Sequence, residues 1–200
     1  MEGVAVERRK IRLRMSLSNL MEFKKEEKMK RRIDAKKAWE IANKVTEVLE
    51  QEHVKYQITG SLRRGVSAVH DIDIVVSCPA NFVFEALSER GGLTVSKVAN
   101  GKKSASIMVN GVQVDSWYAP LELWGAMTLF TTGSKTFNIM MRSHAKKQGL
   151  LLNQYGLFGG QLLIAGREEL QIFEALGLKW VAPEDRNTES WTEKRLVPEM

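Results

Sequence analysis

The sequence is poor in the residues that staple small secreted or zinc-binding proteins: its 200 residues include one cysteine, three histidines and four prolines. Cys78 has no partner for a disulfide within the chain, and no group of Cys and His has the spacing of a zinc site. No apolar run approaches the roughly 18 residues that a membrane-spanning helix needs. The N-terminus also lacks the apolar core of a secretory signal. We therefore expect a cytoplasmic protein that makes no contact with a membrane.

Positive charge is concentrated at one end of the chain, which carries a net charge of +6. Residues 1–33 contain 11 Lys and Arg against 5 Asp and Glu, whereas the rest of the chain holds 19 of each. A basic arm of this kind binds polyanions by releasing counterions. A solvated extension without a partner fits the composition of residues 1–28 equally well, so both interpretations stay open.

Hydrophobic periodicity predicts an α+β protein with two halves. In the first half, residues 34–119, helical patterns cover 34–49 and 81–90, and β patterns cover 54–58, 71–77, 93–98, 104–109 and 112–118. Because Asn110-Gly111 is a strong hairpin signal, we expect a mixed but largely antiparallel sheet. The second half, residues 120–186, is a smaller α+β unit with helices at 121–130, 134–148 and 168–176 and a hairpin of 150–158 with 161–164. A polar tail covers residues 187–200, and we expect the chain after Pro183 to be loosely held.

Three aspartates are phased to share one face of the predicted sheet. Asp71 and Asp73 are two residues apart, so their side chains project to the same side of one strand, about 6.6 Å apart. Asp115 has the matching phase if residues 112–118 form a neighbouring strand. Two carboxylates about 4 Å apart repel by about 4 kcal/mol at an effective dielectric near 20, so a fold keeps such a cluster mainly where cations neutralise it. An isolated Asp-x-Asp, by contrast, is more often a solvent-facing turn.

The chemistry of these side chains indicates which ions they would bind. Carboxylate oxygens suit Mg²⁺, for which Mn²⁺ can substitute. Two such ions held by Asp71, Asp73 and Asp115 would stabilise both the attacking and the leaving oxygen of an in-line displacement.

A glycine-serine turn precedes the aspartates by about ten residues. Gly60 allows backbone N–H groups to approach a phosphate closely, and a short helix after it would point its positive end there. Ser61 can donate a hydroxyl group, while Arg63 and Arg64 can pair with phosphate oxygens. The string is a weak signal alone and a strong one at this distance from Asp71 and Asp73.

These motifs together resemble the family X DNA polymerases, the DNA polymerase beta type within the nucleotidyltransferase superfamily. The resemblance covers roughly residues 31–186 and is nearest to compact viral and phage forms that hold only a palm and a thumb. It rests on GSLRRG at 60–65, Asp-Ile-Asp at 71–73, VQVD at 112–115, and the strings at 130–158 and 172–186. It implies a nucleotidyltransferase palm over residues 34–119 and a thumb over 120–186.

The resemblance also implies residue roles. Asp71 and Asp73 would bind both metals, and Asp115 would bind the catalytic metal and assist deprotonation of a primer 3′-OH. Ser61 and Arg64, beside Gly60, would hold the β and γ phosphates. The other implied contacts are Arg32 with the triphosphate, Phe130 to Gly133 with the sugar, Asn138 with the incoming base, and Arg142, with Tyr155 near it, with the template strand. Asn138 and Arg142 are four residues apart, which places both on one face of their helix.

From this resemblance we expect a monomeric, template-directed DNA polymerase that uses two Mg²⁺ ions to add dNTPs to a primer 3′-OH. Its partner would be a primer–template or gapped duplex, and its reaction short-gap repair, with the nucleoid or a viral or phage replication site as further locations. Two other enzymes remain open: an untemplated terminal transferase and a nucleotidyltransferase that acts on RNA or protein. A non-catalytic nucleic-acid-binding module is the third alternative.

Three positions depart from the family pattern. Phe130-Thr131 stands where a Tyr-Phe pair is frequent, so discrimination against ribonucleotides is left open. His70 replaces a glycine that commonly precedes the first aspartate, and Gln113 occupies a position that is often basic. About 33 residues precede the palm, too few for the family's N-terminal lyase domain, so we expect no abasic-sugar lyase activity.

Overall fold

The structure is a computed structural model that describes residues 32–90 and 92–187. The predicted basic arm (residues 1–33), apart from its last two residues, lies outside the described part of the chain, as does the tail after Asn187.

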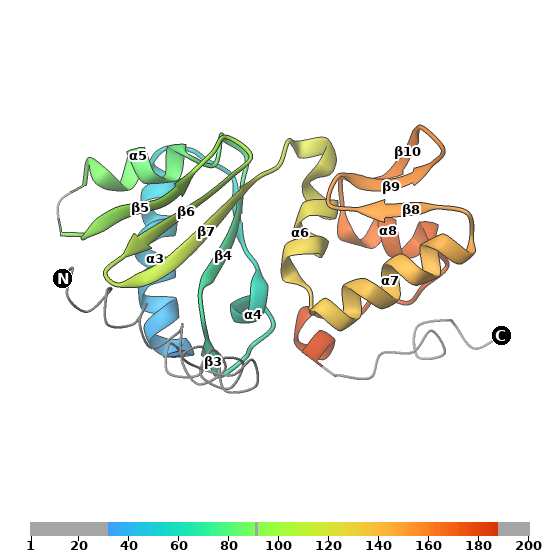
Figure 1. The fold of residues 1–200 in the computed structure, drawn as a ribbon, viewed down its shortest axis with the longest axis horizontal. Coiled ribbons are helices and arrows are strands. Elements are labelled where there is room, and N and C mark those ends of the chain that lie inside the picture. The colour runs from blue at the N-terminus through green and yellow to red at the C-terminus, as the bar shows by residue number, and fades with distance from the viewer. Residues whose placement is uncertain (1–31, 91, 188–200) are drawn as a thin grey trace, which may run out of the picture. The chain divides into compact units, whose positions relative to one another are not determined.

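A five-stranded mixed sheet forms the first half of the described chain, in the strand order β2-β4-β7-β6-β5 (Figure 1). Its strands are β2 (Tyr56–Ile58), β4 (Ile72–Val76), β5 (Val95–Asn100), β6 (Ser104–Val109) and β7 (Val112–Tyr118). The pair β4 and β7 is parallel, and the other three pairs are antiparallel. The sheet is therefore mixed and largely antiparallel, as the hairpin signal at Asn110-Gly111 predicted.

Amphipathic helices cover this sheet. The long helix α3 (Ala35–Gln51) begins at Asp34, whose carboxylate accepts a hydrogen bond of 2.8 Å from the backbone N–H of Lys36. Its buried side chains recur at spacings of three and four, and they include Ile41, Val45 and Leu49. The other elements of this half are β1 (Ile33–Asp34), α4 (Gly60–Arg63), β3 (Ala68–Val69) and α5 (Phe82–Ser88). The helix α3 packs on α5 and β2, so one apolar layer lies between these helices and the sheet.

The second half has its own hydrophobic core. Its elements are η1 (Leu121–Leu123), α6 (Trp124–Thr132), α7 (Lys135–Lys147), β8 (Leu151–Asn153), β9 (Gly156–Gly159), β10 (Leu162–Ala165), α8 (Glu169–Ala175) and η2 (Pro183–Asn187). The strands β8, β9 and β10 form an antiparallel sheet (Figure 1). Its core contains Phe137, Met141, Leu157 and Phe173, all fully buried. This half was predicted as a hairpin with three helices, but a turn at 154–155 divides the predicted strand 150–158 in two.

One residue departs from the alternation of β4, and one further expectation was wrong. Val75 has the phase of Asp71 and Asp73, yet it is fully buried. A second cluster of Ala119, Trp124 and Met127 covers it, because α6 packs against β4. The chain after Pro183 is not loosely held as far as Asn187, since it forms η2 and fully buries Arg186.

Candidate active site

The sheet brings two of the three aspartates side by side. In the parallel pair of β4 and β7, Asp73 lies directly opposite Asp115. Val114 and Ser116 on β7 are buried, while Asp115 between them is half-buried, so the alternation predicted for this strand is confirmed. Asp71 immediately precedes β4 and is also half-buried.

Uncharged donors hold the carboxylates of these two strands. The indole Nε1 of Trp117 donates to Oδ1 of Asp73 over 3.4 Å. The amide Nε2 of Gln113 donates to both oxygens of Asp115, over 3.0 and 3.1 Å. Gln113, Asp115 and Trp117 are spaced by two on β7, so all three side chains share one face of the strand.

The glycine-serine turn lies against the other oxygen of Asp73. Gly60 has a φ of +63°, and a Cβ placed on it would come within 2.1 Å of Oδ2 of Asp73. Glycine is therefore required here both for the backbone conformation and for the close approach of the carboxylate. The short helix α4 begins at this glycine, as predicted, and places Ser61 in its first turn.

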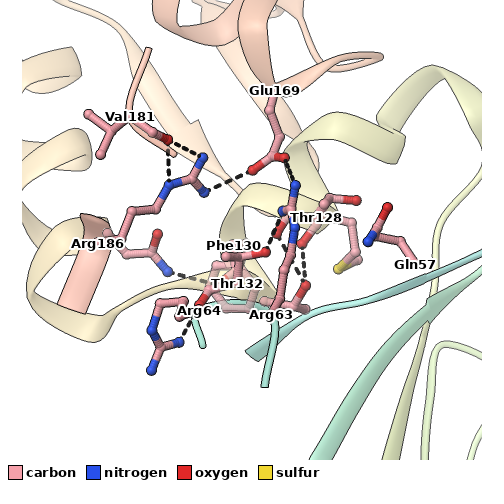
Figure 2. Close-up of polar contacts among 12 residues, drawn as sticks. Gln57, Arg63, Arg64, Thr128, Phe130, Thr132, Glu169, Val181 and Arg186 are labelled. Carbon is pink, nitrogen blue, oxygen red and sulfur yellow. Dashed lines mark hydrogen bonds and ion pairs between the residues drawn. The ribbon is translucent and has the colours of Figure 1, made fainter. Parts of the chain in front are cut away.

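The two arginines at the end of this turn diverge, although both were expected to pair with phosphates. Arg63 donates to the hydroxyl of Thr132 and forms an ion pair of 2.7 Å with Glu169 on α8 (Figure 2). Arg64 instead donates to the backbone carbonyl of Thr132 and, through Nε, to Oδ1 of Asn187 over 2.9 Å. Of the two arginines, only Arg64 lines the cleft described below. The expectation for Arg63 is corrected, because its guanidinium is paired with the carboxylate of Glu169.

A cleft of about 500 Å³ collects most of the predicted site. Of the residues singled out from the sequence, those that line it are Gly60, Ser61, Arg64, Asp71, Asp73, Phe130, Gly133, Asn138 and Arg142. They come from α4, β4, α6 and α7, segments up to about 80 residues apart in the chain. A single concave surface that combines cationic donors with two carboxylates suits a polyanionic ligand together with divalent cations.

The helix α7 supplies one wall of the cleft. Ser134 begins the helix and accepts a hydrogen bond from the backbone N–H of Phe137. Asn138 donates through Nδ2 to the carbonyl of Phe130 over 2.7 Å, and Arg142 one turn later donates to the carbonyl of Asn138. The prediction that Asn138 and Arg142 share a helix face is confirmed, since both line the cleft.

Sequence reasoning missed two residues near this wall. Lys135 lines the cleft together with Thr131, and Asn153 lines a small hollow with Asn138 and Arg142. A lysine directly after a helix-capping serine was a signal for Lys135, because it adds positive charge at a helix N-terminus that already attracts anions. Asn153 carried no such signal.

Charge and burial act strongly on Asp73. Burial, followed by the negative charge of Asp71, raises the pKa of Asp73 from 3.8 to about 7, and Asp115 adds to the rise. The hydrogen bond from Trp117 and the charge of Arg64 lower it. Burial likewise lowers the pKa of the Arg64 guanidinium, and the charge of Asp73 opposes this change. The carboxylates therefore repel one another, which is the condition that a bound cation relieves.

The donor chemistry fits Mg²⁺ or Mn²⁺, because all the candidate ligands are carboxylates. Within residues 32–90 and 92–187, however, no three His, Cys, Asp or Glu side chains are grouped as ligands of a single ion. The convergence of Asp71, Asp73 and Asp115 on a pair of ions thus stays a prediction, supported by the pairing of Asp73 with Asp115 and by their mutual effect on the pKa of Asp73.

Three predicted residues are not among those that line the cleft. Asp115 is held by Gln113 beside it, and Tyr155 lies in the β8–β9 turn with Lys103 Nζ 6.0 Å from its ring centre. Arg32 is exposed and precedes β1. The roles of Tyr155 and Arg32 therefore stay predictions.

None of the helices that the described residues form has the length and apolar character of a membrane span.

The family described as the DNA polymerase beta thumb matches residues 127–187, which corresponds closely to the second half of the described chain.

Curated relatives extend the similarity into the first half. DNA polymerase IV of Saccharomyces cerevisiae is 43% identical over 70 residues, which are 35% of this chain and 12% of the yeast protein. The DNA polymerase/3′-5′ exonuclease PolX of Bacillus subtilis is 29% identical over 163 residues, 76% of this chain and 28% of the relative. The repair DNA polymerase X of African swine fever virus is 26% identical over 136 residues, 64% of this chain and 78% of the viral protein. The chain thus spans less than a third of the yeast and bacterial relatives but most of the viral one.

Among solved structures, polymerase beta of Leishmania infantum, in a ternary P/T complex, is similar with a TM-score of 0.68. The match covers 78% of this chain and 77% of the other at 22% identity, which supports a shared fold of palm and thumb.

Proposed function

Because the chain belongs to the family X DNA polymerases, we propose that it is a template-directed DNA polymerase that adds dNTPs to a primer 3′-OH, in short gaps of duplex DNA. The observation that carries this proposal is the cleft, where the Gly60-Ser61 turn, Asp71 and Asp73 meet the face of α7 that carries Asn138 and Arg142. A nucleoside triphosphate requires these three kinds of contact: to phosphates, to cations and to the base pair.

The chain's own groups divide the work of such a reaction. Ser61 and Arg64 bind the β and γ phosphates, and Lys135 adds a further positive charge at the same opening. Asp71 and Asp73 would hold two Mg²⁺ ions and Asp115 one of them, an arrangement that stabilises the charge developing on the transferred phosphoryl group. Asp115, directly opposite Asp73, would receive the proton of the primer 3′-OH on its carboxylate.

The helix α7 suits recognition of a base pair without reading its sequence. Asn138 and Arg142 present N–H donors one turn apart. The minor groove offers acceptors at equivalent positions in every correct base pair, so donors placed there sense pair geometry. An enzyme that copies any template needs this property.

The proposal is tested with a primer annealed across a one-nucleotide gap, using each of the four template bases in turn. We expect Mg²⁺-dependent incorporation of the complementary dNTP, and Asp115→Ala to abolish it while DNA affinity stays within about twofold of the wild type. Asp185→Ala, which removes an exposed aspartate of η2, is the matched control and should retain full activity.

Other outcomes would replace the proposal. Addition of nucleotides without regard to the template base would identify a terminal transferase, and labelling of RNA or protein would identify a different nucleotidyltransferase. Gap binding without incorporation under any metal would identify a binding module. Comparing dNTPs with rNTPs in the same assay decides whether the enzyme discriminates between the two sugars.

We propose that the protein acts in the cytoplasm, or at a nucleoid or viral replication site within it.

A further inference from the structure

On the strand β7, the side chain two residues before Asp115 is polar and donates to its carboxylate. Nε2 of Gln113 lies 3.0 Å from Oδ1 and 3.1 Å from Oδ2 of Asp115. Both side chains are half-buried. One amide group thus spans both oxygens, the position from which it fixes the rotation of the carboxylate.

The charge of the donor decides what it does to a carboxylate that must also bind a cation. A guanidinium or ammonium group in this place would form an ion pair, and a divalent ion would have to displace it against charge repulsion. The amide of Gln113 is neutral, so an ion has only a hydrogen bond to displace at one oxygen, while the other oxygen keeps its donor.

The neighbouring aspartate is treated in the same way. Trp117, which lies two residues after Asp115 on the same face of β7, donates a hydrogen bond from its uncharged indole N–H to Asp73. Alternate residues of one strand therefore hold two facing carboxylates by neutral donors, and the strand that carries Asp115 also orients its partner. The donors of such an arrangement place no positive charge against the pair, so a cationic ligand has no charged donor to displace.

We propose that Gln113 is a positioning residue that orients the Asp115 carboxylate with an uncharged donor while leaving it able to bind a divalent cation. The inference deepens the proposed function and depends on Asp115 acting there. Gln113 does not touch the triphosphate cleft, so its effect belongs to turnover and cation binding rather than to nucleotide affinity.

Two substitutions separate orientation from charge. Gln113→Met keeps the length of the side chain and removes the donor, so turnover in the gap assay should fall about tenfold with the KM for dNTP within about twofold of the wild type. Gln113→Arg restores a donor but adds a charge. We expect it to weaken Mn²⁺ binding to the protein without nucleotide or DNA by about tenfold, measured by titration calorimetry.

Matched controls exclude general damage to the sheet. Gln57→Met removes an amide from β2 whose Nε2 donates to the carbonyl of Ile58, and Gln161→Arg adds a charge in the exposed β9–β10 turn. Both should resemble the wild type in turnover and in Mn²⁺ affinity. Thermal unfolding of each variant shows whether its fold is intact.

The two readouts fail independently. If Gln113→Met turns over as fast as the wild type, or Gln113→Arg binds Mn²⁺ as tightly, the positioning role of Gln113 is wrong. If the wild type incorporates no nucleotide, the proposed function fails instead, and the Mn²⁺ titration of Gln113→Arg still decides whether this residue governs cation binding at Asp115.

Discussion

Two groups of charged side chains lie near α4, and they differ in whether the partners of their carboxylates are charged or neutral. On one side, Glu169 pairs with Arg63 at 2.7 Å and with Arg186 at 2.9 Å, an arrangement we call the Glu169 network (Figure 2). On the other side, Asp73 in the cleft accepts from an indole, and Asp115, which lies opposite it on β7, accepts from an amide. Opposite charges neutralise each other in the Glu169 network, whereas the donors to Asp73 and Asp115 are neutral and bring no opposite charge to these carboxylates. The first arrangement suits a structural role, and the second suits a ligand.

Arg186 is the buried end of the Glu169 network. It is fully buried, donates twice to the carbonyl of Val181, and its Cζ lies 5.0 to 5.6 Å from the ring centres of Phe137, Phe173 and Trp180. Burial lowers the pKa of its guanidinium, and the charge of Glu169 acts in the opposite direction. The network ties α4 of the first half to α8 and η2 of the second, so it fixes the turn that carries Ser61 and Arg64.

Asp73→Asn is the substitution with the largest expected effect on activity. It removes one of the carboxylates that would hold cations, so single-nucleotide incorporation should fall about 10³-fold or more. The fold should be as stable as the wild type or more stable, because a repelling buried charge is removed. Incorporation kinetics together with urea unfolding check both halves of the prediction. If the free energy of unfolding fell together with the incorporation rate, Asp73 would be a residue that stabilises the fold, like those of the Glu169 network.

Glu169→Gln should have the opposite profile. It leaves the buried Arg186 without its counterion, which costs about 3 kcal/mol of the free energy of unfolding in urea. The matched control is Glu52→Gln, which breaks the exposed pair with Arg90 and should cost less than about 0.5 kcal/mol. Equal losses in the two variants would contradict the structural role of the Glu169 network.

The pH dependence of stability should report on Asp73. Its pKa is about 7 in the folded protein and near 3.8 in the unfolded chain, so the folded state binds more protons between these values. The free energy of unfolding therefore falls as pH rises from about 4 to 7, by about 2 kcal/mol if the partly exposed side chain realises half of the full linkage. Asp73→Asn or saturating Mg²⁺ should flatten this slope, and an unchanged slope in Asp73→Asn would assign it to other groups.

Asn187→Ala should have the smallest effect. Asn187 accepts from Nε of Arg64 and donates to its backbone carbonyl over 2.7 Å, so it helps to aim this arginine at the cleft. Loss of these hydrogen bonds should raise the KM for dNTP about threefold, with turnover nearly unchanged. Steady-state kinetics on the gapped duplex measure both constants. A fall in turnover with constant KM would show that Asn187 acts on a later step.

The sequence predicted those parts of the site that depend on local pattern. Alternation along two strands sufficed to put Asp73 and Asp115 on one face, and the helical repeat sufficed for Asn138 and Arg142. The divergence of Arg63 from Arg64 was beyond such reasoning, because Glu169 lies 106 residues away in the chain. The burial of Val75 and of Arg186 has the same origin: each depends on long-range packing that no local periodicity encodes.

In the proposed mechanism, Asp71, Asp73 and Asp115 hold cations against a triphosphate bound by Ser61 and Arg64. A crystal structure with gapped DNA, a non-hydrolysable dNTP and Mn²⁺ tests it most directly, because anomalous scattering locates the ions. We expect two Mn²⁺ ions on Asp71 and Asp73, one of them also on Asp115, with the β and γ phosphates beside Ser61 and Arg64. Manganese bound away from these carboxylates, or a triphosphate outside the cleft, would contradict it.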